Sequence, residues 1–96
     1  RKKGKLPGPT YFTEYELEYG TDELHIQVDA LSKGDKVLVI DDVIATGGTI
    51  EAVIELTNKF DAEVVAILSI MELEFLHGGQ KLRDSGYEVY SILQEQ

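Results

Sequence analysis

The sequence predicts an α/β fold, in which a mainly parallel sheet with flanking helices is accompanied by a β-hairpin. Three observations support this prediction. Residues 11–28 alternate between apolar and polar side chains around a central turn segment. Residues 37–40 are all apolar, which is typical of a parallel strand buried on both faces. A segment with helical spacing then leads to a second apolar run over residues 64–70, the order of a right-handed β–α–β unit.

The hairpin is predicted from the pattern of residues 11–28. In residues 11–19 tyrosines and other large side chains occupy the odd positions, whereas glutamates occupy most of the even ones. We therefore expect one side of this strand to be buried and the other to be solvated. Residues 20–22 read Gly-Thr-Asp and are predicted to form the turn. Alternation resumes at Leu24, where the second strand is expected to begin.

Helices and strands are expected to alternate after the hairpin. A helix is predicted over residues 49–59, because its apolar side chains recur at three- and four-residue spacing. A buried parallel strand is predicted over residues 64–70. A short helix, interrupted by or beginning after Gly78-Gly79, is expected within residues 75–84, and a closing strand over residues 87–93.

Composition restricts the class of protein. Ninety-six residues suit one small domain, and a hydrophobic content of 43% favours a globular chain. No cysteine is present, which excludes disulfides and thiolate metal sites. The net charge is −9 although four of the nine basic residues fall within the first five positions. An acidic chain repels nucleic acid, so we expect no nucleic-acid partner; we also expect no membrane partner and a cytoplasmic location. The basic cluster is either a local anion site or a solvated terminus.

The most informative segment is residues 37–49, Val-Leu-Val-Ile-Asp-Asp-Val-Ile-Ala-Thr-Gly-Gly-Thr. Asp41 and Asp42 are expected where the buried strand ends, and a small glycine-containing turn then enters a helix. A helix N-terminus presents free N–H groups that favour an anion. The turn lacks the sequence of a triphosphate loop or of a dinucleotide fingerprint. A phosphate beside two carboxylates that can accept hydrogen bonds from a diol suggests ribose 5-phosphate. Taken alone, the acidic pair could be a helix cap or a solvated turn.

This segment resembles the motif by which type I phosphoribosyltransferases bind 5-phosphoribosyl 1-pyrophosphate (PRPP). Two further blocks, residues 1–10 and 15–20, are similar to those of the adenine phosphoribosyltransferases. The resemblance covers essentially the whole chain. It implies that residues 1–96 are the C-terminal part of a single domain of a truncated type I phosphoribosyltransferase-like core. Within it, residues 11–28 would be a hairpin flap and residues 37–49 the PRPP motif.

The resemblance also implies roles for particular residues. The paired acids would hold the ribose hydroxyls, and Glu18 at the hairpin tip would join them as a catalytic residue, although alternation alone makes Glu18 an ordinary outward-facing carboxylate. Tyr19 would belong to the moving flap. The pyrophosphate would lie near Arg1, Lys2 and Lys5. The substrate-binding set for PRPP and AMP is Asp41, Asp42, Val43, Ala45, Thr46, Gly47, Gly48 and Thr49.

The implied reaction is transfer of the phosphoribosyl group from PRPP to adenine, giving AMP and pyrophosphate in purine salvage. Mg²⁺ would be the cofactor, carried by PRPP and not bound directly by protein ligands. A homodimer is expected, together with a missing N-terminal segment or chain, and the isolated 96-residue chain is expected to be inactive. Two alternatives remain: a non-catalytic PRPP-sensing domain, and a phosphoribosyltransferase for another purine base. Glu72 is either a helix cap or a ligand near the metal.

Overall fold

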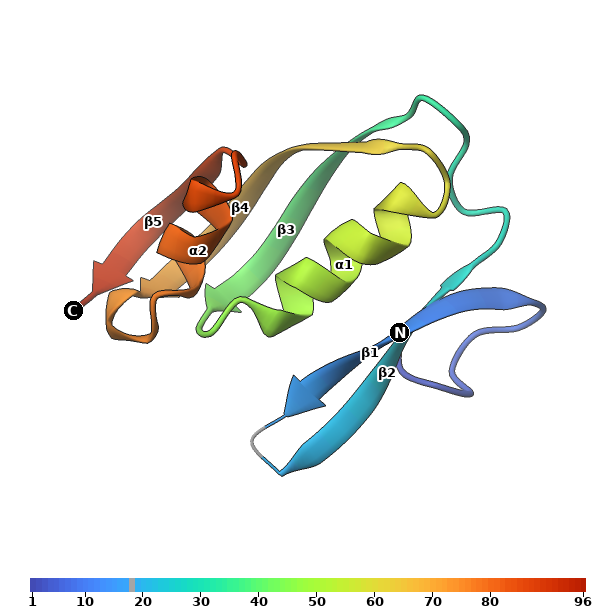
Figure 1. The fold of residues 1–96 in the computed structure, drawn as a ribbon, viewed down its shortest axis with the longest axis horizontal. Coiled ribbons are helices and arrows are strands. Elements are labelled where there is room, and N and C mark those ends of the chain that lie inside the picture. Colours follow the sequence, from blue (N-terminus) through green and yellow to red (C-terminus); the bar gives the residue numbers. More distant parts are fainter. Residues whose placement is uncertain (18) are drawn as a thin grey trace.

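A three-stranded parallel sheet lies at the centre of the computed structural model, which describes residues 1–17 and 19–96 (Figure 1). The strands are β3 (Lys36–Ile44), β4 (Glu63–Leu73) and β5 (Val89–Glu95), hydrogen-bonded in the order β3-β4-β5. Both pairs are parallel, and the order places β4 between β3 and β5. This arrangement confirms the predicted α/β fold with a parallel sheet.

Two helices connect the strands and lie on the same face of the sheet (Figure 1). Helix α1 (Gly48–Asn58) joins β3 to β4, and a 3-10 turn (η1, Glu74–Leu76) followed by α2 (Gly78–Asp84) joins β4 to β5. The helix expected within residues 75–84 is thus divided at His77, and both glycines lie inside α2, so the expectation that the glycines interrupt or precede the helix was wrong. The buried core joins both helices to all three strands and consists of Val39, Ile44, Ile50, Ile54, Val64, Ile67, Leu82 and Val89.

The hairpin is formed by β1 (Thr10–Leu17) and β2 (Gly20–Gln27), which pair antiparallel and pack against α1 (Figure 1). Thr13 is buried in this contact, while Glu14 and Glu16 on the other side of β1 are exposed. The ring of Tyr11 meets that of Phe60 edge-on, with centroids 5.1 Å apart. The predicted alternation therefore holds around Thr13 and the half-buried Tyr15, but the expected burial is wrong at Tyr11 and Tyr19, which are 40% and 89% exposed.

The position predicted for the hairpin turn was wrong. Residues 20–22 do not form the turn but open β2, where Gly20 pairs with Leu17 and Asp22 pairs with Tyr15. Only two residues separate the paired ends of the strands. Gly20 has a φ of 102°, a left-handed conformation that suits the start of the second strand after so short a connection.

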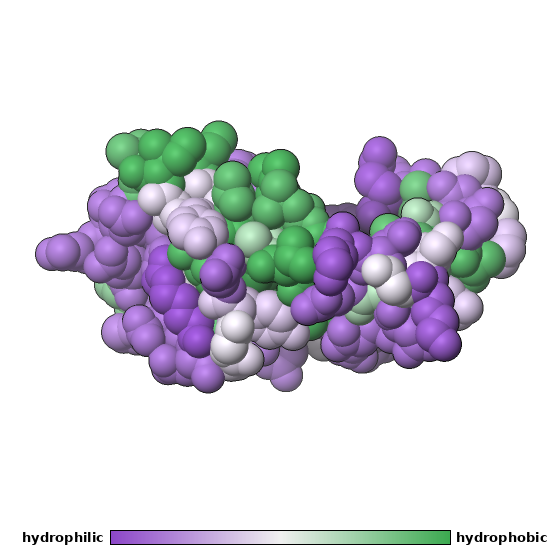
Figure 2. Space-filling model, turned by 90° about the horizontal axis from the view of Figure 1, so that it is seen from above, coloured by the Kyte–Doolittle hydropathy of each residue, from purple (hydrophilic) through white to green (hydrophobic). Residues whose placement is uncertain are grey.

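Burial of β3 on both faces, which the apolar run predicted, is not observed. Val39 faces the helices and is buried, but its neighbours Leu38 and Ile40 are 49% and 72% exposed. The reason is that both helices cover one face, which leaves the opposite face of the sheet uncovered. Figure 2 shows hydrophobic side chains gathered over the part of the molecule that holds this sheet. We call this surface the apolar face; its residues are Leu38, Ile40, Leu68, Ile70, Tyr90 and Ile92.

An ion pair attaches α2 to the sheet. Glu72 is 2% exposed, and its two carboxylate oxygens accept hydrogen bonds from the Arg83 guanidinium at 2.8 and 2.9 Å. Ser91 Oγ donates a third hydrogen bond to the same carboxylate. The Arg83 contact holds the pKa of Glu72 below its usual range, and burial opposes this shift only in part. A helix cap does not describe these contacts, and a role of Glu72 near a metal stays a prediction.

We expect Glu72→Gln to lower the free energy of unfolding at neutral pH by about 1.5–3 kcal/mol, the range for hydrogen bonds to charged groups. The lowered pKa of Glu72 means that its contribution is complete above the ordinary carboxyl pKa. It is lost as the pH falls through the lowered value. Urea unfolding at neutral and acid pH measures both effects.

The matched control is Glu63→Gln, which breaks the Lys36–Glu63 ion pair between two largely exposed side chains. That change should cost less than about 1 kcal/mol. Equal losses for the two variants would contradict a special role of the buried pair.

Candidate functional site

A short loop, residues 45–47, connects the end of β3 to the start of α1. The first hydrogen bond of the helix joins the Glu51 N–H to the Gly47 carbonyl at 2.9 Å. The N–H groups of the three preceding residues, 48–50, therefore have no acceptor within the helix. Free N–H groups and the positive end of the helix dipole together favour an anion at this position.

Glycine is required at two places around this loop. Gly47 has a φ of 88°, a left-handed conformation that other residues rarely adopt. Gly78, at the start of α2, lies directly against the loop, and its N–H donates to the Ala45 carbonyl at 3.1 Å. This second contact could not be predicted from the sequence, because 31 positions separate Gly47 from Gly78 and periodicity concerns only neighbours along the chain.

The acidic pair lies within β3 and not after its end. Strand β3 continues to Ile44, and Asp41 pairs with Ser69 of β4. The strand extends further than the apolar run indicated because ladder pairing with β4 continues beyond Ile40. Asp41 accepts a hydrogen bond from the Asp42 N–H, and Asp42 accepts one from the next N–H, each at 2.8 Å. Neighbouring residues of a strand point to opposite faces, so the two carboxylates are not equivalent.

The candidate site is a small cavity of about 80 Å³ at the end of β3. Asp41 and Val43 line it together with the loop and the first turn of α1. Asp42 is not among the described residues that line the cavity. The structure thus brings one acid of the pair together with the predicted phosphate loop. The lining residues are Asp41, Val43, Ile44, Ala45, Thr46, Gly47, Gly48, Thr49 and Ile50.

The surroundings of Asp41 disfavour its charged form, and its pKa is raised. Partial burial raises the pKa of Asp41 above its ordinary value, and the neighbouring Asp42 carboxyl raises it further. The hydrogen bond from the Asp42 N–H opposes the shift but does not cancel it. A hydroxyl that donates a hydrogen bond to the Asp41 carboxylate would stabilise its charged form.

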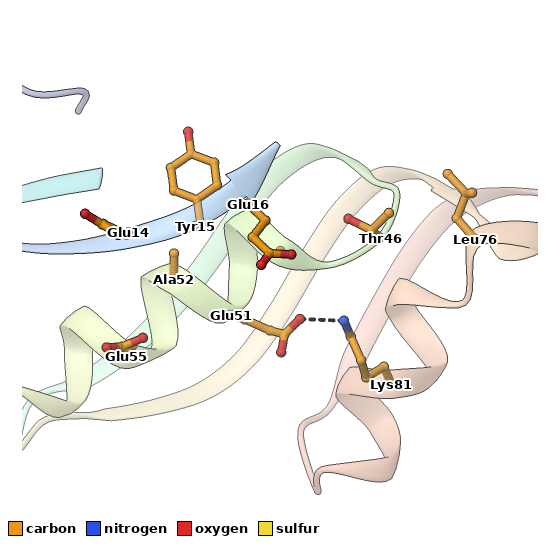
Figure 3. A pocket seen from close by; sticks show the side chains of 10 residues that line it. Glu14, Tyr15, Glu16, Thr46, Glu51, Ala52, Glu55, Leu76 and Lys81 are labelled. Atoms are coloured by element: carbon orange, nitrogen blue, oxygen red, sulfur yellow. Dashed lines mark ion pairs between the residues drawn. The ribbon is translucent and has the colours of Figure 1, made fainter. Parts of the chain in front are cut away.

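A larger cleft of about 730 Å³ lies beside the loop, between β1 and the two helices (Figure 3). Four glutamates line it, and its one cation, Lys81, is paired with Glu51 across the cleft. Figure 3 shows Lys81 reaching from α2 towards α1. This concentration of carboxylates opposes a phosphate, so we place the anion site at the smaller cavity. The four glutamates are Glu14, Glu16, Glu51 and Glu55.

The basic N-terminal residues lie along the hairpin. Lys2 pairs with Leu24 of β2 through an isolated backbone bridge, and its ammonium is 3.2 Å from Asp22. The pKa of Asp22 is lowered, first by a hydrogen bond from the Glu23 N–H and then by Lys2. Arg1 is joined to His25 of the same strand through backbone hydrogen bonds, and the Lys5 N–H donates to the Lys2 carbonyl. None of these basic residues lines the cavity at the loop within the described chain.

The hairpin brings the end of β1 close to the loop. The Glu16 carbonyl lies 3.9 Å from the position that a Cβ of Gly48 would occupy. Tyr19 is 89% exposed. Glu18, the residue predicted to be catalytic, lies outside the described residues, and its role stays a prediction.

Within residues 1–17 and 19–96, no group of three or more His, Cys, Asp and Glu side chains is placed to hold a metal ion. Neither α1 nor α2 is long and apolar enough to cross a membrane.

Comparison with known proteins places this fold and sequence in a narrow group. The family described as the phosphoribosyl transferase domain matches residues 8–96. The adenine phosphoribosyltransferase of Halothermothrix orenii is 52% identical over 95 residues, which are 99% of this chain and 55% of that protein. The enzyme of that name from Methylobacterium radiotolerans is 53% identical over 94 residues. The chain spans about half the length of the curated relatives it matches.

Solved structures agree with this result. A crystal structure of adenine phosphoribosyltransferase from Thermoanaerobacter pseudethanolicus superposes with a TM-score of 0.92 at 46% identity, covering 99% of this chain and 54% of that one. The enzyme from Trypanosoma brucei, in complex with AMP, pyrophosphate and ribose-5-phosphate, gives a TM-score of 0.86 at 32% identity, covering 99% and 44%.

The raised pKa of Asp41 predicts a stability effect. A carboxyl whose pKa is raised in the folded state destabilises the fold once the pH exceeds its unfolded pKa. Asp41→Asn should therefore increase the free energy of unfolding at neutral pH, on the order of 0.5–1 kcal/mol, as is common where an active site is strained. The gain should disappear at acid pH, where the aspartic acid is protonated.

Urea unfolding across this pH range measures the effect. Asp29→Asn, at an exposed position after β2, controls for the general loss of one negative charge. A loss of stability in Asp41→Asn at neutral pH would contradict the electrostatic account.

Proposed function

This chain belongs to the phosphoribosyl transferase family, and from that premise we propose that it is part of an adenine phosphoribosyltransferase. The protein would transfer the phosphoribosyl group of PRPP to adenine and release AMP and pyrophosphate. The observation that carries the proposal is the cavity in which free N–H groups at the start of α1 adjoin the Asp41 carboxylate. Curated relatives of about 50% identity bear the name adenine phosphoribosyltransferase, which supports the choice of base.

The loop would bind the 5′-phosphate. The N–H groups of residues 48–50 point away from the helix and are free to donate, and Thr46 and Thr49 are exposed and supply hydroxyls at the same position. Gly47 lets the backbone approach the anion closely. The ribose-5-phosphate in the Trypanosoma brucei structure supports a ligand of this kind.

The acids would hold the ribose. Asp41 lines the same small cavity as the loop, and its carboxylate would accept a hydrogen bond from a ribose hydroxyl. Asp42, on the other face of β3, would contact the second hydroxyl only if the sugar spans the strand end. Val43 lines the same cavity and would provide an apolar contact towards the base.

The reaction is a substitution at C1′ of the ribose. A ring nitrogen of adenine forms a bond to C1′ as the C1′–oxygen bond breaks, pyrophosphate leaves with the electron pair, and the nitrogen loses its proton. The C1′ centre becomes cationic on the way. Residues that hold the phosphate and the hydroxyls fix C1′ between base and leaving group, which lowers the barrier by positioning. Carboxylates near the ribose also favour developing positive charge.

Mg²⁺ is the cofactor that we propose. PRPP would carry the ion, since Mg²⁺ is commonly bound through substrate phosphates and keeps several waters. The Asp41 carboxylate in the cavity fits this arrangement, because it would accept a hydrogen bond from such a water without binding the ion directly. When bound, Mg²⁺ would supply positive charge to the departing pyrophosphate. Arg1, Lys2 and Lys5 remain the predicted protein cations for that group. Their position along β2 means that the hairpin carries them.

We propose that residues 11–28 act as the flap. Strand β1 ends beside the loop, so movement of the hairpin would open or cover the site. Glu18 and Tyr19 would approach the reacting centre when the flap closes. We also propose that residues 1–96 are the C-terminal part of one domain, because the family match covers residues 8–96 and the relatives are about twice as long.

The apolar face supports a further part of the proposal. Exposed apolar areas of this kind are commonly covered by protein, and the relatives are about twice as long as this chain. We propose that other segments of a longer chain or a second subunit cover it, that the complete enzyme is a cytoplasmic homodimer, and that residues 1–96 alone are inactive.

Thr49→Val tests the phosphate site. The change removes one hydroxyl at nearly constant shape from an exposed position, so the fold should be retained. Loss of a hydrogen bond to a charged group costs about 1.5–3 kcal/mol. Calorimetry with ribose 5-phosphate on the full-length protein should therefore show binding weaker by roughly ten- to a hundredfold. Thr21→Val, at an exposed position of β2, is the control. Unchanged affinity in Thr49→Val would exclude this hydroxyl from the site.

Asp41→Asn combined with Asp42→Asn tests the function. The full-length protein should form AMP from adenine and PRPP, and the double variant should lose roughly two or more orders of magnitude in turnover through lost positioning and charge. AMP formation is followed by chromatography. A parent protein that binds PRPP without forming AMP would favour the sensor, and transfer to a different purine would correct the base. A fully active double variant would refute the ribose role.

A further inference from the structure

The first turn of α2 supports the phosphate loop from behind. Gly78 is buried, and its N–H donates to the Ala45 carbonyl at 3.1 Å. A Cβ at Gly78 would overlap the Ala45 carbonyl and would stand 2.6 Å from the Gly47 nitrogen, closer than such atoms approach one another. In the opposite direction, a Cβ at Gly47 would stand 3.3 Å from the Gly78 Cα. The two backbones are thus in direct contact.

Helix α2 is held in place by contacts that do not involve the loop. Arg83 binds Glu72 of β4 through two hydrogen bonds, and Lys81 pairs with Glu51 of α1 at 2.6 Å. Leu82 is buried in the core between these two charged residues. Because β4, α1 and the core fix the helix, Gly78 presents a rigid surface to the loop.

We propose that Gly78 is a positioning residue for the phosphate loop. Its N–H fixes the Ala45 carbonyl, and its missing side chain lets Gly47 keep the left-handed conformation from which α1 starts. The direction of the free N–H groups at residues 48–50 then depends on the contact with α2. This inference rests on the proposed function, because it assigns the contact a purpose in binding the 5′-phosphate.

The test compares Gly78→Ala with Gly79→Ala in the full-length protein. Both glycines are buried neighbours in the first turn of α2, but a Cβ at Gly79 would meet the Glu72 carboxylate and not the loop. Gly79→Ala therefore reproduces the loss of stability without touching the site. Calorimetry with ribose 5-phosphate, the KM for PRPP and urea unfolding are measured for both variants.

Gly78→Ala should bind ribose 5-phosphate more weakly by roughly ten- to a hundredfold, the effect of an ångström-scale displacement of a binding group. Its KM for PRPP should rise more than its kcat falls. Gly79→Ala should lose stability, but its affinity for ribose 5-phosphate and its KM for PRPP should stay within about twofold of the parent protein. Equal affinities in Gly78→Ala and Gly79→Ala would overturn the positioning role.

A measurement on the unchanged protein covers the case in which Gly78→Ala does not fold. Ribose 5-phosphate should slow hydrogen exchange of the Gly78 N–H, because a bound phosphate fixes the loop whose carbonyl accepts its hydrogen bond. Unchanged exchange at Gly78, in a protein that binds the ligand, would overturn this inference and leave the proposed function standing. A parent protein that does not bind ribose 5-phosphate would overturn both.

Discussion

Three N–H groups at the start of α1 have no acceptor within the helix, and the site is built around this constraint. The chain carries a net charge of −9, and four glutamates line the cleft beside the loop. Side-chain cations are therefore scarce where the anion is expected. Backbone N–H groups supply positive potential without any basic residue, and they cannot move away from the ligand as a lysine can. An acidic protein can bind a phosphate in this way, provided that the loop itself is held rigidly.

One group of the same site, the Asp41 carboxyl, opposes folding once it is charged. The pKa of Asp41 is raised by burial and by Asp42, and Gly47 requires a left-handed backbone that few other residues tolerate. The cost of charging Asp41 lies at the junction of β3 and α1, whereas the stabilising contacts lie elsewhere: in the core around Ile67, which is fully buried, and in the pair between Glu72 and Arg83. Strain at a binding site and its compensation at a distance are common in enzymes.

Local sequence patterns predicted the elements because each rests on short-range physics. The spacing of Ile50 and Ile54 indicates a helix, and the apolar runs indicate strands, so the strand–loop–helix unit could be found from thirteen residues. Other features depend on contacts between distant residues. Pairing with β4 extends β3 through the acidic pair, and Gly78 reaches the loop from another helix. The exposure of Ile40 could not be predicted either, because an apolar strand has the same sequence pattern whether or not its second face is covered.

Helix α1 connects the hairpin to the site. One side of α1 packs on the sheet and another on β1, whose Tyr11 meets Phe60 just after the end of the helix. At the opposite end of α1, the Glu16 carbonyl lies beside Gly48. The hairpin thus extends along the helix from an aromatic contact at one end to the phosphate loop at the other. The Tyr11–Phe60 contact joins the hairpin to the end of α1 that lies away from the loop, so the proposed flap could separate at the loop while this contact is kept. Such a movement would expose the anion site while the hairpin remains attached, as a lid over a phosphate requires.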